Sequence, residues 1–249
     1  MSGHSKWASI KHKKAATDSK RGKAFTKIIR ELTIAARHGG GDPNTNPRLR
    51  LAIQKSKDAN MPADNVTRAI KKGTGELEGQ VLEEISYEGY APGGVALLVN
   101  SLTDNKNRTT SEIRNIFTKH GGNMAGQGAV AWIFEKKGYF VVSKDSIEEE
   151  KLMSIILEAG AEDIETEESN YSITCQPNDY EAVKSALEAK NIKLEVSELS
   201  MIPKNSIKVT GETAKKILKL VETLEDSDDV QNVYANFDMP DEIIKEVEE

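Results

Sequence analysis

Apolar side chains recur at helical spacing in the first quarter of the chain, where intervals of three and four residues place them on one helix face. Gly39 ends the first such stretch, and Asn46-Pro47 has the sequence of a helix start, with Asn as cap and Pro in the first turn. Pro62 opens a third stretch, which Gly73 is expected to close. The pattern predicts a small helical bundle over residues 22–75, whose expected core is Phe25, Ile28, Leu32, Ile53 and Ile70.

Beyond residue 80 the pattern changes to short alternating runs separated by turn residues, which is typical of strands. Thr109 and Glu112 have the spacing of a capping box and predict a helix start. The expected order is two strands, a helix and a third strand, and a later helix and strand near the C-terminus supply the missing pieces of a sheet. The predicted segments are strands at 82–87, 95–102 and 130–134, a helix at 214–224 and a strand at 230–237.

Residues 137–200 have a different and self-contained order of elements. Strand, helix, two strands, helix and strand follow one another, which is the βαββαβ signature of a ferredoxin-like sandwich. The predicted fold class is therefore multidomain α and α+β, with a small N-terminal helical bundle plus two α+β domains. The ferredoxin-like domain is inserted into a discontinuous middle domain, residues 80–135 and 206–240.

Charge is distributed very unevenly along the chain. Residues 1–75 hold 17 Lys and Arg against 5 Asp and Glu, whereas the full chain has a net charge of −6 and a pI of about 5.5. The remainder is therefore strongly acidic, and such asymmetry indicates a polyanion partner. Residues 1–21 show no sustained helix or strand period, so we expect a basic flexible arm that is loose when free.

The basic arm and the first helix have the chemistry of a phosphate-binding surface. Each Lys or Arg that neutralises a phosphate releases counterions, which gives salt-sensitive binding without sequence preference. Trp7 could stack on an unpaired base or, alternatively, anchor the arm on its own domain. The predicted nucleic-acid-binding residues are Lys6, Trp7, Lys11, Lys13, Lys14, Lys20, Arg21, Lys23, Lys27 and Arg30.

A polar segment in front of the middle-domain helix is a candidate second binding surface. It contains Asp104, Asn105, Asn107 and Arg108, and the alternative is an ordinary loop that leads into a helix.

The sequence shows no pattern typical of an enzyme, a metal site or a cofactor site. The four histidines have no metal-ligand spacing, and no serine lies in a Gly-x-Ser-x-Gly elbow. The single cysteine, Cys175, falls in a predicted strand, where a buried inert thiol is expected, and it excludes a disulfide framework. The longest apolar stretch, Val95 to Val99, is too short to span a bilayer, so no membrane partner is expected.

Several short blocks together resemble the YebC/PmpR family. The blocks occur in order along the chain, and they depart from the family pattern at Ala91 and Ala125, where glycine is expected. The blocks are Ser2–Trp7, Ile10–Lys14, Lys20–Lys23, Thr103–Thr109 and Met201–Lys204.

The resemblance implies three domains around a cleft and a cytoplasmic protein. Members of the family are described as DNA-binding transcriptional regulators. Related members act in translation, including a mitochondrial translational activator of cytochrome c oxidase and bacterial forms linked to ribosomes stalled at proline runs. The resemblance supplies no catalytic residues.

The leading hypothesis is a non-enzymatic nucleic-acid-binding protein, a DNA-binding transcriptional regulator whose acidic body turns away from the polyanion and could hold a basic protein partner. The alternative is a ribosome-associated translation factor that binds ribosomal RNA through the same basic surface and relieves stalled translation. A third possibility is a protein-interaction scaffold whose arm only increases solubility. Composition does not discriminate between DNA and RNA, because only the polyanion changes.

Overall fold

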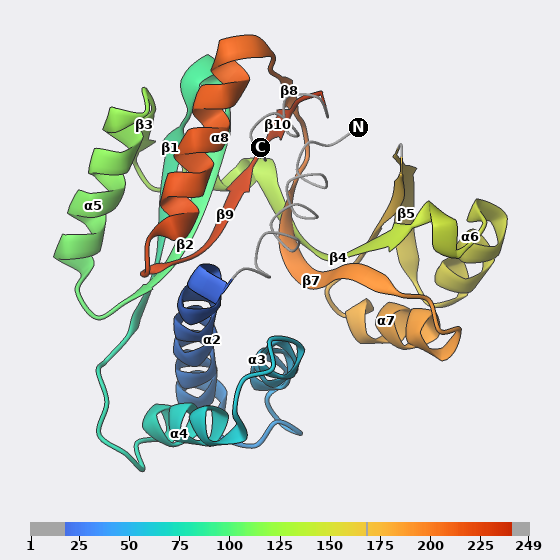
Figure 1. The fold of residues 1–249 in the computed structure, drawn as a ribbon, viewed down its shortest axis with the longest axis horizontal. Helices are drawn as coiled ribbons and strands as arrows, with labels where there is room; N and C mark the ends of the chain where they lie inside the picture. Colours follow the sequence, from blue (N-terminus) through green and yellow to red (C-terminus); the bar gives the residue numbers. More distant parts are fainter. Residues whose placement is uncertain (1–17, 168, 241–249) are drawn as a thin grey trace.

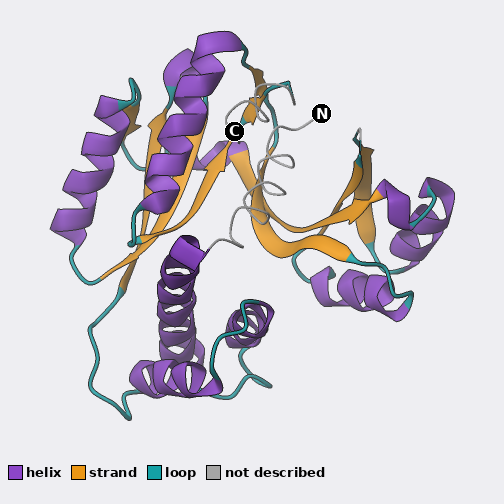
Figure 2. Cartoon of the chain, in the orientation of Figure 1, coloured by secondary structure: helices purple, strands orange, loops and turns teal. Residues whose placement is uncertain are grey.

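The computed structural model describes residues 18–167 and 169–240, with side chains from residue 22 onward. Figures 1 and 2 show three units: a helical unit, a central unit with one sheet, and a ferredoxin-like unit with a second sheet. The expected fold class, multidomain α and α+β, is confirmed. None of the helices in the described part of the chain is long and apolar enough to cross a membrane.

The helical unit consists of α2 (Asp18–Gly39), α3 (Pro47–Asp58) and α4 (Ala63–Thr74). The predicted helix start at Asn46 is confirmed: its side-chain oxygen accepts a hydrogen bond from the Leu49 N–H at 3.1 Å. The Asn46 amide also donates to the carbonyls of Ala35 and Gly40, so one side chain joins the end of α2 to the start of α3. The predicted core residues pack together around buried Leu32.

Two predicted helix boundaries in this unit are wrong. Helix α2 begins at Asp18, so the last four residues of the expected flexible arm (1–21) have helical backbone. Gly22 does not interrupt the helix, because a single glycine costs only about 1 kcal/mol there. Helix α4 continues through Gly73 to Thr74 and ends at Gly75, which has a positive φ of 84°.

Gly73 has a packing role instead of a capping role. A Cβ atom at this position would lie 2.3 Å from the Thr33 carbonyl oxygen and 2.7 Å from the Ala36 Cβ. The absence of a side chain therefore allows α4 to approach α2 closely.

The central unit is built on a four-stranded sheet in the order β3-β1-β2-β9, in which all the paired strands are antiparallel. Strand β9 comes from the C-terminal part of the chain and pairs with β2. Helices α5 and α8 pack on one face, over a core that includes Leu97, Phe117 and Leu218. The elements are β1 (Glu83–Tyr90), β2 (Ala96–Thr103), α5 (Lys106–Lys119), β3 (Asn123–Ala125), α8 (Gly211–Asp226) and β9 (Val230–Ala235), with a short turn η1 (Pro92–Gly94) and a small parallel pair, β8 (Ile207–Lys208) and β10 (Phe237–Asp238).

The strand predicted at 130–134 is wrong. Residues Ala131–Ile133 form a short 3-10 turn, η2, and the third strand of the sheet lies earlier, at β3. The physical reason is the buried carboxylate of Glu88, which accepts the backbone N–H groups of Val130 and Ala131. Those N–H groups are therefore not available to a strand ladder.

The ferredoxin-like unit has strand order β5-β6-β4-β7 with antiparallel pairing throughout. Helices α6 and α7 pack on one face around buried Phe140, Leu152 and Val183. The elements are β4 (Phe134–Ser143), η3 (Lys144–Ser146), α6 (Glu149–Glu158), β5 (Ala161–Thr166), β6 (Asn170–Cys175), α7 (Tyr180–Ala189) and β7 (Leu194–Pro203).

Strands β4 and β7 are longer than the sequence pattern indicates. They pair from Phe134↔Pro203 onward, so residues 201–203, which lie between the two expected domains (137–200 and 206–240), belong to β7. The extension forms a two-stranded ribbon, residues 134–137 and 200–203, that leads from the ferredoxin-like unit to the central unit (Figure 1). Phe134 and Met201 of this ribbon pack with Leu98 and Tyr234 of the central sheet, on the face opposite α5 and α8.

The close approach at Gly73 gives a direct test of the helical unit. We expect Gly73→Ala to lower the free energy of unfolding by roughly 1–3 kcal/mol, because its methyl group overlaps the backbone of α2. Chemical denaturation measures the change. The matched control is Gly22→Ala, where a Cβ meets nothing within 4 Å and helix propensity raises stability by up to about 1 kcal/mol. Equal stability of the Gly73→Ala variant and the wild type would contradict the packing argument.

Candidate nucleic-acid interface

The predicted nucleic-acid-binding residues fall into three groups in the structure. Lys6, Trp7, Lys11, Lys13 and Lys14 lie outside the described residues. Lys20 and Arg21 lie at the start of α2, where only the backbone is described. Lys23, Lys27 and Arg30 follow on the same helix, and their contacts are defined.

Two lysines of α2, Lys23 and Lys27, contact the C-terminal end of α8. Lys27 Nζ donates to the Glu225 carbonyl oxygen at 2.6 Å, and Lys23 Nζ donates to the Asp226 carbonyl oxygen at 3.0 Å. The last carbonyls of a helix lack intrahelical partners and form the negative end of the helix dipole, which favours nearby cations. These lysines therefore attach the helical unit to the central unit, and their contact with phosphate stays a prediction.

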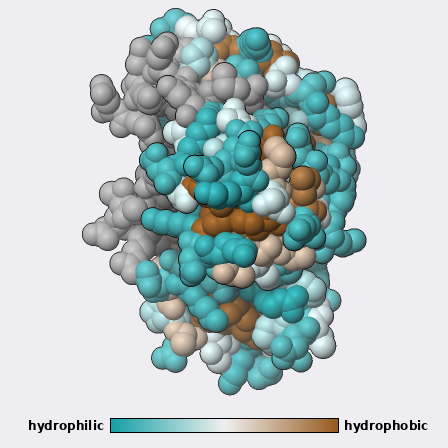
Figure 3. Space-filling view, turned by 90° about the vertical axis from the view of Figure 1, so that its right-hand side faces the viewer, coloured by the Kyte–Doolittle hydropathy of each residue, from teal (hydrophilic) through white to brown (hydrophobic). Residues whose placement is uncertain are grey.

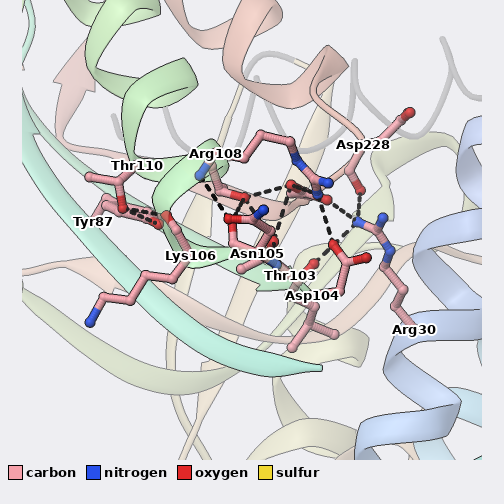
Figure 4. Close-up of polar contacts among 12 residues, drawn as sticks. Arg30, Tyr87, Thr103, Asp104, Asn105, Lys106, Arg108, Thr110 and Asp228 are labelled. Carbon is pink, nitrogen blue, oxygen red and sulfur yellow. Dashed lines mark hydrogen bonds and ion pairs between the residues drawn. The ribbon is translucent and has the colours of Figure 1, made fainter. Parts of the chain in front are cut away.

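Arg30, one turn further along α2, contacts the loop between α8 and β9. Its Nη1 donates to the Asp229 Oδ1 at 2.7 Å and to the Leu102 carbonyl oxygen at 3.1 Å. The same group also contacts the Asp228 carbonyl oxygen. Figure 4 shows Arg30 from α2 and Arg108 from α5 approaching this loop from two sides.

Asp229 is the shared partner of these two arginines and is only 3% exposed. Its Oδ2 accepts hydrogen bonds from Arg108 Nη2 at 2.7 Å and from Thr109 Oγ1 at 2.6 Å. Burial by itself would raise the pKa of this carboxyl group, but the hydrogen bonds from Arg108, Thr109 and Arg30 outweigh it and hold the pKa below its ordinary value. The group is therefore ionised at neutral pH and binds both guanidinium groups as an anion.

The candidate second surface is the start of helix α5. The predicted capping box at Thr109 is wrong: the cap is Asn105, whose side-chain oxygen accepts from the Arg108 N–H at 3.1 Å, and the Thr109 hydroxyl bonds the buried Asp229 instead. Arg108 Nη2 also contacts the Asp104 Oδ1 at 2.9 Å. Asn107 is exposed in the first turn. The structure thus brings the two predicted surfaces together, because Arg30 and Arg108 bind the same carboxylate.

A second junction joins the helical unit to the central sheet through Arg48 of α3. Its Nε donates to the Glu31 Oε1 of α2 at 2.7 Å, and its Nη2 pairs with Glu84 of β1. Burial acts to lower the pKa of Arg48, but its hydrogen bonds to the two carboxylates raise it overall. Further cations of the helical unit have exposed side chains on α3 and α4: Arg50, Lys55, Lys57, Arg68, Lys71 and Lys72.

A different polar feature lies on the central sheet at Glu88, which is 4% exposed. Its Oε1 accepts the Gly128 N–H at 2.7 Å. Its Oε2 accepts the Val130 and Ala131 N–H groups at 2.6 and 2.8 Å. Burial would raise its pKa, but the three N–H donors lower it below the ordinary value. This carboxylate holds residues 126–132, the glycine-containing loop before β4, in one conformation.

The single cysteine of the chain, Cys175, is buried. Burial raises the pKa of the Cys175 thiol to about 11, which makes the thiolate scarce at neutral pH. Within residues 18–167 and 169–240, no group of three His, Cys, Asp or Glu side chains is placed to hold a metal ion.

Three residues with clear roles in the structure have little or no signal in the sequence: Asp229, Glu88 and Trp132. Asp229 follows Asp226-Ser227-Asp228, which has the composition of a solvated turn, and its arginine partners are distant in sequence. Glu88 has no distinct signal, since it directly follows the predicted strand at 82–87, where a charged residue is ordinary. Trp132 had the signal of a large aromatic residue after a Gly-rich loop.

Comparison with known proteins gives matches over nearly the whole chain. Residues 5–76 match a family model described as the TACO1/YebC protein N-terminal domain, and residues 82–237 match one described as the TACO1/YebC second and third domain. A protein of Syntrophus aciditrophicus named "Probable transcriptional regulatory protein" is 57% identical over 248 residues, covering 99% of both chains. One of Natranaerobius thermophilus with the same name is 56% identical, covering 98% of this chain and 99% of the relative.

A solved structure supports the fold independently. The crystal structure of a conserved hypothetical protein from Aquifex aeolicus has a TM-score of 0.80 and 49% sequence identity, covering 90% of this chain and 92% of that chain.

Removing the charge of Asp229 should destabilise the junction. We expect Asp229→Asn to lower the free energy of unfolding by roughly 2–3 kcal/mol, below the full cost of breaking a buried pair because Arg108 is half exposed. Urea denaturation measures the change. The control is Asp226→Asn, an exposed partner of Lys23 at 3.5 Å, which should change stability by less than about 0.5 kcal/mol.

The same pair of proteins should differ in its dependence on pH. Because the folded pKa of Asp229 is lowered, its stabilising contribution is complete above the unfolded pKa of about 4 and is lost as the pH falls through the folded value. The gap in unfolding free energy between wild type and Asp229→Asn should therefore be constant from pH 5 to 7 and shrink below pH 4. A gap that does not change on acidification would argue against the ionised junction.

Proposed function

Because the chain belongs to the TACO1/YebC family, we propose that it is a regulatory protein that binds nucleic acid and catalyses no reaction. The basic arm and the helical unit grip phosphates, and DNA is the favoured polyanion because the relatives are named transcriptional regulators. In this proposal the protein acts in the cytoplasm and regulates transcription by binding DNA.

The separation of charge is the observation that carries the proposal. Residues 1–75 have 17 basic and 5 acidic side chains, and several of the basic side chains on α3 and α4 are exposed. A local excess of cations attracts a polyanion and raises the rate of encounter. The proposed contacts include the predicted residues of the arm, Lys6 to Arg21, and the start of α2.

The ferredoxin-like unit has the opposite sign and supports a fixed orientation. Residues 134–203 contain 16 acidic and 7 basic side chains. Figure 3 shows the face on this side of the molecule as largely hydrophilic, with apolar patches between the polar side chains. Repulsion between this unit and phosphate turns it away from the nucleic acid, where it is free to contact a basic protein partner.

The contacts around Asp229 hold the basic helical unit in a fixed position against the central unit. Lys23, Lys27 and Arg30 bind the end of α8 and the following loop, so α2 has a fixed place against the central unit. The arm leads directly into α2, which sets the position from which it reaches the polyanion.

The salt dependence of DNA binding tests the arm. Neutralising Lys11, Lys13 and Lys14 together should flatten the slope of log affinity against log salt concentration by about three times 0.9 on duplex DNA. Fluorescence anisotropy at several salt concentrations measures the slope. An unchanged slope would remove the arm from the interface.

A matched control for this experiment lies on the acidic unit. Neutralising Lys151, Lys190 and Lys193 removes the same number of charges from the ferredoxin-like unit and should leave the slope as in the wild type. If both triple variants flatten the slope equally, net charge and not the arm determines binding.

In the translation alternative the same basic surface binds ribosomal RNA. The two proposals are therefore distinguished by comparing the affinity for DNA with the affinity for RNA. Parallel titrations with duplex DNA and structured RNA at matched salt, with co-sedimentation with ribosomes after DNase treatment, distinguish the two. Tighter binding to RNA together with DNase-resistant co-sedimentation would replace the DNA proposal with the ribosomal one.

A further inference from the structure

Two aromatic side chains stand out on the surface of the central unit. Trp132 in the turn η2 is 65% exposed, and Tyr90 at the end of β1 is 37% exposed. The Trp132 Nε1–H and the Tyr90 hydroxyl each donate to the carbonyl oxygen of Ala129 at 3.1 Å. One acceptor therefore orients both rings.

The loop that carries this acceptor is itself fixed. The buried carboxylate of Glu88 accepts the N–H groups of Gly128, Val130 and Ala131, which lie on both sides of Ala129. Charge-assisted bonds of this kind are about twice as strong as neutral ones. The two rings are thus held on a preorganised loop, and binding a ligand there loses little conformational freedom.

A hollow of about 410 Å³ adjoins the loop. It is lined by the polar residues Ser86, Asn100 and Gln127, by Glu88, whose carboxylate is already bound to the loop, by the apolar residues Leu98 and Met201, and by Gly128 and Ala131 of the loop. Its volume lies in the range of small-ligand sites, roughly 300–1,000 Å³. Amide and hydroxyl groups beside apolar walls suit a flat heterocycle with hydrogen-bonding edges.

Tyr90 and the hollow lie on the same face of the central sheet. Side chains alternate along a strand, so Ser86, Glu88 and Tyr90 of β1 point to one side. This is the face opposite α5 and α8, onto which the ribbon of β4 and β7 packs through Met201. The aromatic side chain of Tyr90 therefore stands at the end of the row that lines the hollow.

An exposed cation, Lys136, lies on the side of the ribbon that carries Met201. Lys136 pairs in register with Met201, so the two side chains share one face, and Lys136 is exposed. Its charge also reaches Glu84 of β1: the pKa of Glu84 is lowered chiefly by the hydrogen bond from Arg48, with a further contribution from Lys136. Lys136 therefore adds positive charge on the face of the ribbon that it shares with Met201, a residue that lines the hollow, and such a charge favours a phosphate attached to a bound base.

We propose that Trp132, Tyr90 and the adjoining hollow form a site for an unpaired nucleobase of a single-stranded nucleic acid. Stacking on an aromatic ring needs a free base face, which a base inside a duplex does not offer. The site rests on the proposed function and deepens it: the basic arm supplies affinity for the backbone, and this site favours unpaired segments.

Tryptophan fluorescence tests the site directly. The chain has two tryptophans, so a Trp7→Phe background leaves Trp132 as the reporter. Titration with single-stranded DNA and RNA oligonucleotides should quench this signal, whereas duplex DNA of equal charge should not. The DNA and RNA arms show which sugar the site accepts.

Affinity measurements complete the test. Trp132→Ala should weaken single-strand binding by about 5-fold to 150-fold and leave duplex binding unchanged, and Trp132→Phe should retain most of the affinity. The matched control is Leu157→Ala on α6, which removes another exposed large apolar side chain, 60% exposed, outside the hollow. It should bind single strands as the wild type does.

The outcomes separate this inference from the proposed function. Failure of the wild type to bind any oligonucleotide at low salt would overturn both. Normal binding with unchanged Trp132 fluorescence and wild-type affinity in Trp132→Ala would overturn the base site alone and leave Trp132 to a protein contact. An equal loss on duplex and single strands would also overturn it, because stacking requires an unpaired base.

Discussion

The arrangement of the helical and central units depends on one buried carboxylate, Asp229. It lies between α8 and β9 and accepts hydrogen bonds from Arg30 of α2 and Arg108 of α5. A buried charge without a partner is strongly destabilising, so loss of either arginine is expected to destabilise the contact between the three elements. Lys23 and Lys27 of α2, bound to the end of α8, strengthen this junction, and Arg48 between Glu31 and Glu84 forms the second one.

Because of this junction, not every cation of residues 1–75 is available to a polyanion. Charge counting treats every Lys and Arg of residues 1–75 as available to a polyanion, but Lys27 and Arg30 bind protein oxygens and position α2. The cations fall into two sets by geometry: those that fix the helical unit and those with exposed side chains on α3 and α4. Neighbouring Lys and Arg side chains therefore have two roles: some fix the helical unit, and others are exposed to a polyanion.

Local patterns predicted most of the fold. The helical stripe from Phe25 to Ala36, the start at Asn46-Pro47 and the βαββαβ order of the ferredoxin-like unit depend on nearby residues, and the structure has all three. The wrong predictions occur where the local structure depends on a residue that is far away in the sequence. The local pattern predicts a helix end at Gly73 because it does not contain the tertiary contact with Thr33. It predicts a strand at 130–134 because it does not contain Glu88, some 40 positions away, which accepts the N–H groups of Val130 and Ala131. The junction at Asp229 was not predictable for the same reason.

The pairing of β9 with β2 also has a consequence for synthesis of the chain. Strand β2 ends at Thr103, but its neighbour begins only at Val230, and the carboxylate that receives Arg30 is the residue just before it. At typical elongation rates, translation of the intervening segment takes on the order of ten seconds. During that interval the nascent chain has an open sheet edge at β2, and the contiguous ferredoxin-like unit, which ends with β7 at Pro203, is synthesised completely before β9 begins. During synthesis the pairing of β9 with β2 and the contact of Arg30 with Asp229 therefore form last. A chain that terminates before Asp229 forms neither of them.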